Sequence, residues 1–202
     1  MNNGPFDAKT AALESLMLRI AHDAARHRKK YYIGGGFAID IAFGGLSRAH
    51  DDIDFYPVEA DTLWWKNWFG EQGYAISIDV DMAPLRYAFL VSGQVEPATG
   101  VASLADVYPI AVDDVGSISM AVRPDATEVW DGMLSISGGR GIWPGKSWRN
   151  VHGVMYKGYK IFIEDYHAVL AQKEAYIRLH PSERLGDKHL HDFRRAGTKP
   201  SV

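Results

Sequence analysis

Residues 31–57 read YYIGGGFAIDIAFGGLSRAHDDIDFYP, and this stretch decides the fold. A short β-prone run, Tyr31–Ile33, meets three glycines at Gly34–Gly36. An apolar helical segment, Phe37–Phe43, follows and ends at two further glycines. A polar loop then leads into a second strand, Asp52–Tyr56, which Pro57 closes. A strand, a glycine turn, a helix and a strand with two acids, in that order, are typical of phosphate chemistry.

The acidic strand predicts a cation site. Asp52 and Asp54 are two residues apart, so in a strand they point to the same face while Ile53 points to the other. Two neighbouring carboxylates repel each other unless a cation lies between them. Carboxylate oxygens suit Mg²⁺, which binds one or two of them together with substrate phosphates.

The glycine turn predicts a phosphate site beside the acids. Gly35 and Gly36 allow the backbone to approach a phosphate closely and tolerate a positive φ. The helix that starts at Phe37 adds free N–H groups and the positive end of its dipole. Each signal is weak by itself, because most glycine runs are turns and most D-x-D pairs are solvated strand ends. Their combination, preceded by Arg48 and His50, is much more specific.

The segments Gly35–Asp40 and Arg48–Asp54, with Gly44 between them, closely resemble the small antibiotic nucleotidyltransferases. These are the aminoglycoside and lincosamide adenylyltransferases of the polymerase-β-like superfamily. The resemblance is dense over about 25 residues. It implies an α/β (α+β) nucleotidyltransferase core, in which helices flank a mixed sheet and C-terminal helices cover one side. It also implies Mg²⁺, with one or two ions, and ATP or another nucleoside triphosphate as co-substrate.

Further site residues follow from the same resemblance. The segment Ala105–Ile110 resembles the third acidic strand of the family, with Tyr108 where a histidine is usual. Asp106 is therefore expected to be a third metal ligand, the general base, or both, together with the metal ligands Asp52 and Asp54. Lys173 stands where related transferases carry a lysine that faces the triphosphate.

A closing K-D-x-x-D element adds a second lysine. Lys188 and Asp192 match it, and His189 replaces its first acid. Both lysines could instead be ordinary surface residues. Arg48 is expected to contact phosphate because its charge is permanent. His50 is expected to position the loop or to contact phosphate.

Patterning along the rest of the chain divides it into a core domain, residues 1–163, and a helical segment packed on it, residues 164–202. Helices are predicted at 8–29, capped by Asp7, at 59–70, at 164–179 and from about residue 186. Strands are predicted at 74–80, 86–92 and 104–112, with a loop over 93–100 and a hairpin over 154–162 that turns at 157–158. The tryptophans of the second helix, Trp64, Trp65 and Trp68, could stack on a base, but packing against the sheet is favoured.

The composition of the chain excludes some kinds of site and favours others. The 202 residues contain no cysteine, which excludes disulfides and thiolate metal sites and fits a cytoplasmic location. No apolar run reaches the length of a membrane span. The net charge of −3, from 22 basic and 25 acidic residues, disfavours broad nucleic-acid binding and is compatible with a cationic small substrate.

The sequence thus predicts a Mg²⁺-dependent enzyme that moves a nucleoside monophosphate, AMP from ATP, to a hydroxyl of a small molecule. The resemblance indicates an aminoglycoside or lincosamide as the acceptor. Three alternatives stay open: a toxin that modifies RNA or protein, a transferase for an unrelated metabolite, and a non-catalytic nucleotide-binding relative. The oligomeric state is not predicted.

Overall fold

The computed structural model describes residues 7–78, 87–94, 101–112, 118–121, 127–130, 133–135, 142–144, 152–179 and 185–200. Three further acids near Asp106 in the sequence, Glu96, Asp113 and Asp114, are rival candidates for its role, and they lie outside these ranges. Among the described helices, none is long and apolar enough to cross a membrane.

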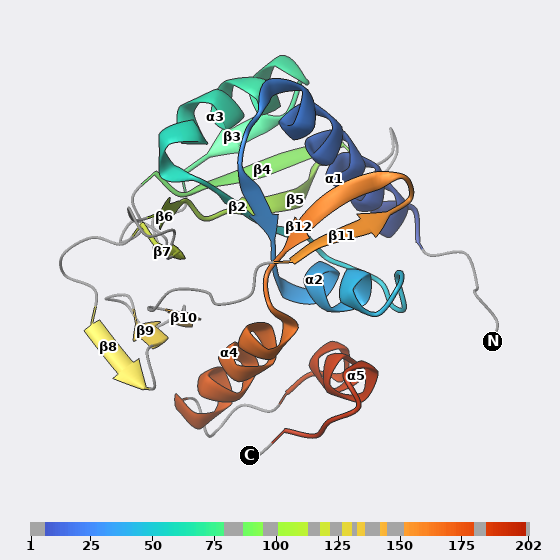
Figure 1. The fold of residues 1–202 in the computed structure, drawn as a ribbon, viewed down its shortest axis with the longest axis vertical. Helices are drawn as coiled ribbons and strands as arrows, with labels where there is room; N and C mark the ends of the chain where they lie inside the picture. The colour runs from blue at the N-terminus through green and yellow to red at the C-terminus, as the bar shows by residue number, and fades with distance from the viewer. Residues whose placement is uncertain are drawn as a thin grey trace.

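A mixed sheet forms the centre of the molecule, as predicted (Figure 1). Its strands run in the order β11-β12-β1-β2-β5-β4-β3. Two neighbouring pairs, β1 with β12 and β2 with β5, are parallel, and the other pairs are antiparallel. The bounds are β1 Tyr31–Ile33, β2 Ile53–Pro57, β3 Ala75–Ser77, β4 Phe89–Gln94, β5 Val101–Val107, β11 His152–Tyr156 and β12 Tyr159–Ile163.

In the part of the chain that the structure describes, two smaller sheets accompany the central one. One pairs β6 (Ile110–Val112) with β7 (Ile118–Met120), and the other joins β8 (Thr127–Trp130), β9 (Met133–Ser135) and β10 (Ile142–Pro144). The strand predicted over 104–112 is therefore wrong as a single element. It is divided between β5 and β6 at Tyr108 and Pro109, where proline has no N–H to donate to a ladder.

The other predicted strands are present with shifted ends. The strand predicted over 74–80 is β3, and that over 86–92 is β4, which extends two residues into the predicted loop. The hairpin is confirmed: β11 and β12 pair around Lys157 and Gly158, which both have positive φ, at 47° and 85°. Two successive residues with positive φ are what a tight type I′ hairpin turn requires.

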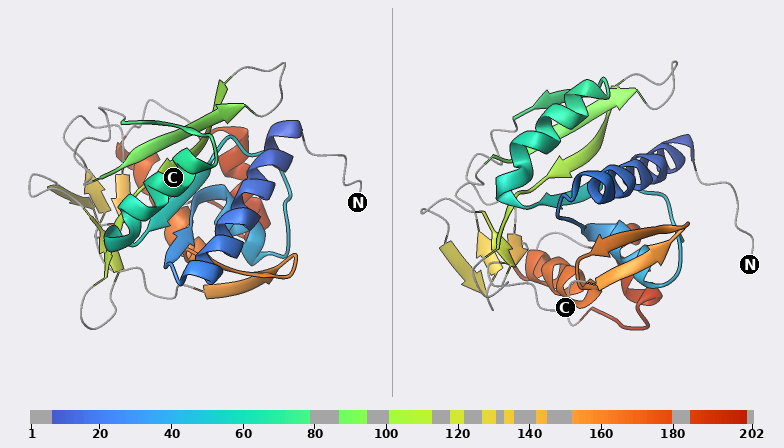
Figure 2. Two further views of the ribbon diagram at one scale, coloured as in Figure 1. Left: turned by 90° about the horizontal axis from the view of Figure 1, so that it is seen from above. Right: turned by 45° about the horizontal axis from the view of Figure 1, so that its top comes forward.

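Helices α1, α2 and α3 pack against the central sheet, and α4 and α5 lie beside α2 (Figures 1 and 2). They are α1 Ala8–His27, α2 Gly35–Ala42, α3 Thr62–Glu71 after a 3₁₀ turn η1 Glu59–Asp61, α4 Tyr166–Leu179 and α5 Asp187–Arg195. Asp7 caps α1 as predicted, since its side chain accepts a hydrogen bond from the Thr10 N–H at 2.7 Å. Helices α2 and α4 begin at Gly35 and Tyr166, whereas the sequence placed their starts at Phe37 and Glu164.

The main core lies between the sheet and the helices α1, α2 and α3. Residues of α1 predicted at helical spacing are buried there, and Phe55 of β2 packs on Trp65 with ring centroids 4.9 Å apart. Trp65 is fully buried and Trp68 nearly so. The prediction that these tryptophans pack against the sheet is confirmed. The face of the sheet that carries Ile53 and Phe55 is therefore committed to packing, which leaves the opposite face for chemistry.

Candidate active site

The two central acids are direct neighbours on adjacent parallel strands. Asp54 of β2 pairs in register with Asp106 of β5, and Leu90 of β4 continues the same row. Registered residues point to the same face, so the two carboxylates share one side of the sheet. The core residues Phe55 and Val107 form the next row, which points to the other side. The expected alignment of Asp106 with the acidic strand is thus present.

Negative charge is concentrated around Asp54. Burial, followed by the charges of Asp52 and Asp106, raises the pKa of Asp54 to about 7. Lys173 and Lys188 act in the opposite direction and lower it. A carboxyl whose pKa is raised by two further carboxylates marks a place where a cation would relieve repulsion.

Asp106 is oriented by hydroxyl groups. The Tyr108 hydroxyl donates to its Oδ2 at 3.2 Å, and the Ser103 hydroxyl lies 3.5 Å from its Oδ1. Tyr108 thus occupies the place of the histidine usual in the family and contacts the acid directly. Such contacts hold the carboxylate in one rotamer, which a general base or a metal ligand needs.

The glycine turn adjoins Asp54. The Gly34 N–H donates to the Asp54 carbonyl at 2.9 Å, and Gly35 adopts a positive φ of 57°. A β-carbon on Gly35 would overlap the Asp54 side chain. The expectation of a positive φ at Gly36 is wrong: this residue lies within α2, and a β-carbon on it would instead overlap the Arg48 guanidinium. The phosphate turn and the acids are therefore in direct contact.

Arg48 is engaged by a buried acid. Its Nε and Nη2 donate to Asp192 of α5 at 2.8 and 3.1 Å, and the Asp192 side chain is fully buried. Lys173 of α4 approaches the same carboxylate at 3.4 Å. The prediction that Arg48 contacts phosphate gains no support from this geometry, because its guanidinium ties the loop before β2 to α5.

The two lysines lie on the side of the acids. Burial lowers the pKa of Lys173, while the charges of Asp192 and Asp54 raise it. Its Nζ also lies 3.2 Å from Nδ1 of His189, whose pKa burial and Lys173 lower to about 4, so the neutral ring can accept. Lys188 donates to Asp51 at 2.7 Å near the solvent.

His50 positions the loop, one of the two roles expected for it. The ring is buried, stacks on Phe37 with centroids 4.0 Å apart, and has Nε2 2.9 Å from the buried Asp40. Asp40 also accepts from the Ser47 N–H and hydroxyl. Hydrogen bonds from His50 and Ser47 lower the pKa of Asp40 against the cost of burial. Asp40 thus holds the loop before β2 at two points, Ser47 and His50.

Glu164 is a site residue that the sequence pattern missed. It follows β12, and its N–H donates to the Ile33 carbonyl at 2.8 Å. Its side chain is fully buried, and neither carboxyl oxygen has a hydrogen-bond partner of normal geometry. Burial, then the charge of Asp54, raises its pKa to about 8. The alternation of Ile161 and Ile163 into the core was the signal that Glu164 would point to the opposite face.

The donor set at Asp52, Asp54 and Asp106 fits Mg²⁺. All three side chains offer hard oxygen atoms, and the repulsion among them calls for a cation. Over the described ranges, no three potential ligands are already gathered closely enough to enclose an ion. The three acids suit the metal by chemistry and charge, and their present spacing does not enclose an ion.

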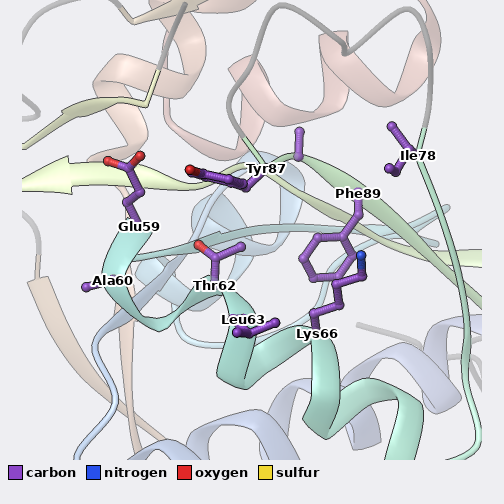
Figure 3. Close-up of a pocket in the computed structure, with 9 residues that line it drawn as sticks. Glu59, Ala60, Thr62, Leu63, Lys66, Ile78, Tyr87 and Phe89 are labelled. Carbon is purple, nitrogen blue, oxygen red and sulfur yellow. The ribbon is translucent and has the colours of Figure 1, made fainter.

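A separate cavity of about 540 Å³ lies on the other face of the sheet (Figure 3). It opens between α3 and the start of β4, and its apolar lining residues include Leu63, Tyr87 and Phe89. Phe89 pairs with Val107, one position away from the row of Asp106, so it points away from the acids. This cavity is not the place where the carboxylates would act.

Comparison with known proteins agrees with the geometry. Residues 16–97 match the sequence model of the aminoglycoside-2''-adenylyltransferase family. A search of curated proteins gives no match. Among solved structures, the lincomycin-bound lincosamide antibiotic adenylyltransferase LnuA is similar, with a TM-score of 0.62 and 20% identity over 91% of this chain and 96% of that one.

The antibiotic-resistance factor ANT(2'')-Ia is similar as well. Its solution structure gives a TM-score of 0.59 at 19% identity over 93% of this chain and 83% of that one. Its complex with adenylyl-2''-tobramycin gives 0.58 at 20% identity over 90% and 86%. The predicted resemblance to antibiotic nucleotidyltransferases and the predicted fold are confirmed.

Proposed function

We propose a specific reaction for this chain, a nucleotidyltransferase by its similarity to the antibiotic adenylyltransferases: transfer of AMP from ATP to a hydroxyl of an aminoglycoside or lincosamide. The observation that carries the proposal is the registered pair Asp54 and Asp106 beside the turn that contains Gly35. Acids and a glycine turn in contact on one free sheet face supply metal ligands and a phosphate cradle at a single place.

The residues divide the work as follows. Asp52, Asp54 and Asp106 would hold one or two Mg²⁺ ions, which supply charge neutralisation and lower the pKa of the attacking hydroxyl. Backbone N–H groups at Gly35 and Gly36 bind phosphate oxygens at the start of α2. The acceptor oxygen forms a bond to the α-phosphorus as the bond to the pyrophosphate oxygen breaks, and Asp106 takes the hydroxyl proton.

The lysines contribute charge. Lys173 and Lys188 act on Asp54 from α4 and α5, so they stand on the side where pyrophosphate would leave. A fixed cation stabilises charge that develops on the leaving group. The Lys188 side chain is half exposed, whereas the Lys173 side chain is 14% exposed.

A small acceptor is favoured over RNA. The basic residues that could form an RNA-binding stripe are partly used inside the protein: Lys29 pairs with Asp61 at 2.8 Å, and Arg195 donates to the carbonyls of Phe43 and Gly45. Nucleic-acid binding depends on lysine and arginine that are available to phosphates.

Incubation with Mg²⁺, labelled ATP and a panel of aminoglycosides, lincosamides and bulk RNA tests the proposal. Label on an antibiotic supports it, and label on RNA alone refutes it. Asp52→Asn and Asp54→Asn are each expected to abolish transfer while the fold is kept. The matched control is Glu71→Gln, which removes an exposed acid from α3 and should leave transfer unchanged. Near-normal turnover in either aspartate variant would exclude the metal assignment.

A further inference from the structure

Glu164 extends the row of acids across the sheet. Ile163 of β12 pairs in register with Ile33 of β1, and the Glu164 N–H donates to the Ile33 carbonyl. One position further along, Glu164, Gly34 and Asp54 therefore stand side by side on neighbouring strands. All three positions face the side of the sheet that carries Asp106. The transfer chemistry described above has no use for Glu164.

Gly34 leaves the space that the Glu164 side chain fills. Gly34 is extended, with φ −113°, so no backbone conformation forces a glycine there. A β-carbon at this position would come within 2.6 Å of Glu164 Oε2 and would overlap the Tyr56 ring. The carboxyl group of Glu164 thus leans across Gly34, toward the strand of Asp54.

This arrangement is costly for stability. A buried carboxyl group whose nearest donor, the Gly35 N–H, lies outside normal hydrogen-bond geometry loses its hydration and receives little in return. An apolar side chain of similar size would fill the same space at a lower cost. Groups of this kind concentrate at functional sites, where local stability is given up for chemistry.

The burial also determines what the group can do. Because burial and the charge of Asp54 raise the pKa of Glu164 to about 8, the carboxyl group holds a proton at neutral pH. A protonated carboxyl group is both a donor and an acceptor of hydrogen bonds. Glutamine has the same shape and both functions, whereas methionine has similar length and neither.

Resting on the proposed function, we propose that Glu164 is a positioning residue of the transfer site, whose carboxyl group fixes the glycine turn and Asp54 for nucleotide binding. Gly34 connects Glu164 directly to Asp54. Gly34 touches Glu164 on one side and donates to the Asp54 carbonyl on the other, and Gly35 lies against the Asp54 side chain. A shift at Gly34 therefore moves the phosphate turn and a metal ligand together.

Glu164→Gln and Glu164→Met in the full chain test this role. The measurements are the thermal midpoint, the Kd for ATP with Mg²⁺ by calorimetry, and kcat and KM for both substrates. We expect the glutamine variant to stay within about threefold of the parent in every constant. The methionine variant should melt at or above the parent temperature, yet bind ATP at least about tenfold more weakly, because methionine offers no oxygen to the Gly35 N–H that acts on the Glu164 carboxyl group. Its KM for the acceptor should be unchanged.

A matched control separates function from stability. Tyr31→Phe removes a buried hydroxyl that likewise has no hydrogen-bond partner of normal geometry, from the opposite, core-facing side of β1. It should raise the thermal midpoint and leave ATP binding unchanged. If Glu164→Met binds ATP as well as Glu164→Gln, the side chain only fills space and the proposal fails. If both folded variants lose ATP equally, the ionised carboxylate itself is required, which also overturns the proposal.

Failure of the proposed function can be distinguished from failure of the positioning role of Glu164. If the parent protein binds ATP and Mg²⁺ but labels no antibiotic, only the acceptor assignment fails, and the ATP titrations still decide the role of Glu164. If the parent binds no nucleoside triphosphate, both the proposed function and the positioning role are refuted.

Discussion

Replacing Asp192 should test how strongly α5 is held to the site. Its carboxylate is fully buried and accepts from Arg48 at 2.8 and 3.1 Å, with Lys173 at 3.4 Å. It joins three segments: α5, the loop before β2, and α4. Asp192→Asn keeps the shape but removes the negative charge, so two largely buried cations lose their counter-charge.

The magnitude follows from burial. Removing one partner of a buried ion pair costs about 3–5 kcal/mol, because the other charge stays buried. Asparagine still accepts one hydrogen bond from Arg48, and the Arg48 side chain is 13% exposed, so we expect a loss of about 2–4 kcal/mol. For a chain of this size the thermal midpoint should fall by roughly 5–15 °C.

The control is the ion pair between Lys188 and Asp51, which joins the same helix to the same loop. Its atoms are 2.7 Å apart, but the side chains are 50% and 65% exposed. Asp51→Asn should therefore cost only about 0–1 kcal/mol, and less in high salt. Urea unfolding of both variants measures the difference. Equal losses in the two variants would refute the conclusion that burial gives the Asp192 cluster its strength.

Three further predictions concern the acids and the turn. Without metal, the free energy of unfolding should fall as pH rises from about 5 to about 8, because native Asp54, with a pKa raised to about 7, keeps a proton that the unfolded chain has released. Denaturant titrations along this range check it; the slope should flatten in Asp54→Asn, and a rise in stability would contradict the raised pKa. Gly35→Ala should weaken ATP binding in calorimetry, since its β-carbon would overlap Asp54, whereas Gly44→Ala, also at positive φ but with open space around it, should not. Asp106→Asn should lower turnover at least about 100-fold in steady-state assays while ATP binding weakens less than in Asp52→Asn, and full turnover would exclude Asp106 as the base.

Local signals predicted much of the fold. The order of strand, glycine turn, helix and acidic strand predicted β1, α2 and β2 with ends shifted by at most two residues, and Lys157-Gly158 marked the hairpin turn. The resemblance of residues 105–110 to the third acidic strand of the family led to Asp106, and its register with Asp54 shows that the two acids share a face. These features depend on short-range periodicity and turn chemistry, which a sequence carries openly.

Long-range pairings could not be predicted in the same way. Arg48 and Asp192 are 144 positions apart, and nothing in the local sequence of either indicates the other. Glu164 precedes a strongly helical run, so its neighbourhood favoured a helix start, yet parallel pairing of β12 with β1 makes it part of the sheet. The positive φ belongs to Gly35 and not Gly36 because Asp54 lies against that residue, a contact across two strands.

The charge balance of the site bears on how a nucleotide would enter. Arg48 and Lys173 share the carboxylate of Asp192, and Lys188 pairs with Asp51. The cations near the turn are thus largely neutralised by the protein's own acids, while Asp54 remains among like charges. Free ATP would bring further negative charge to a face that already repels it. We therefore expect ATP to bind weakly without a divalent cation and far more tightly with one, because the cation neutralises phosphates and carboxylates together.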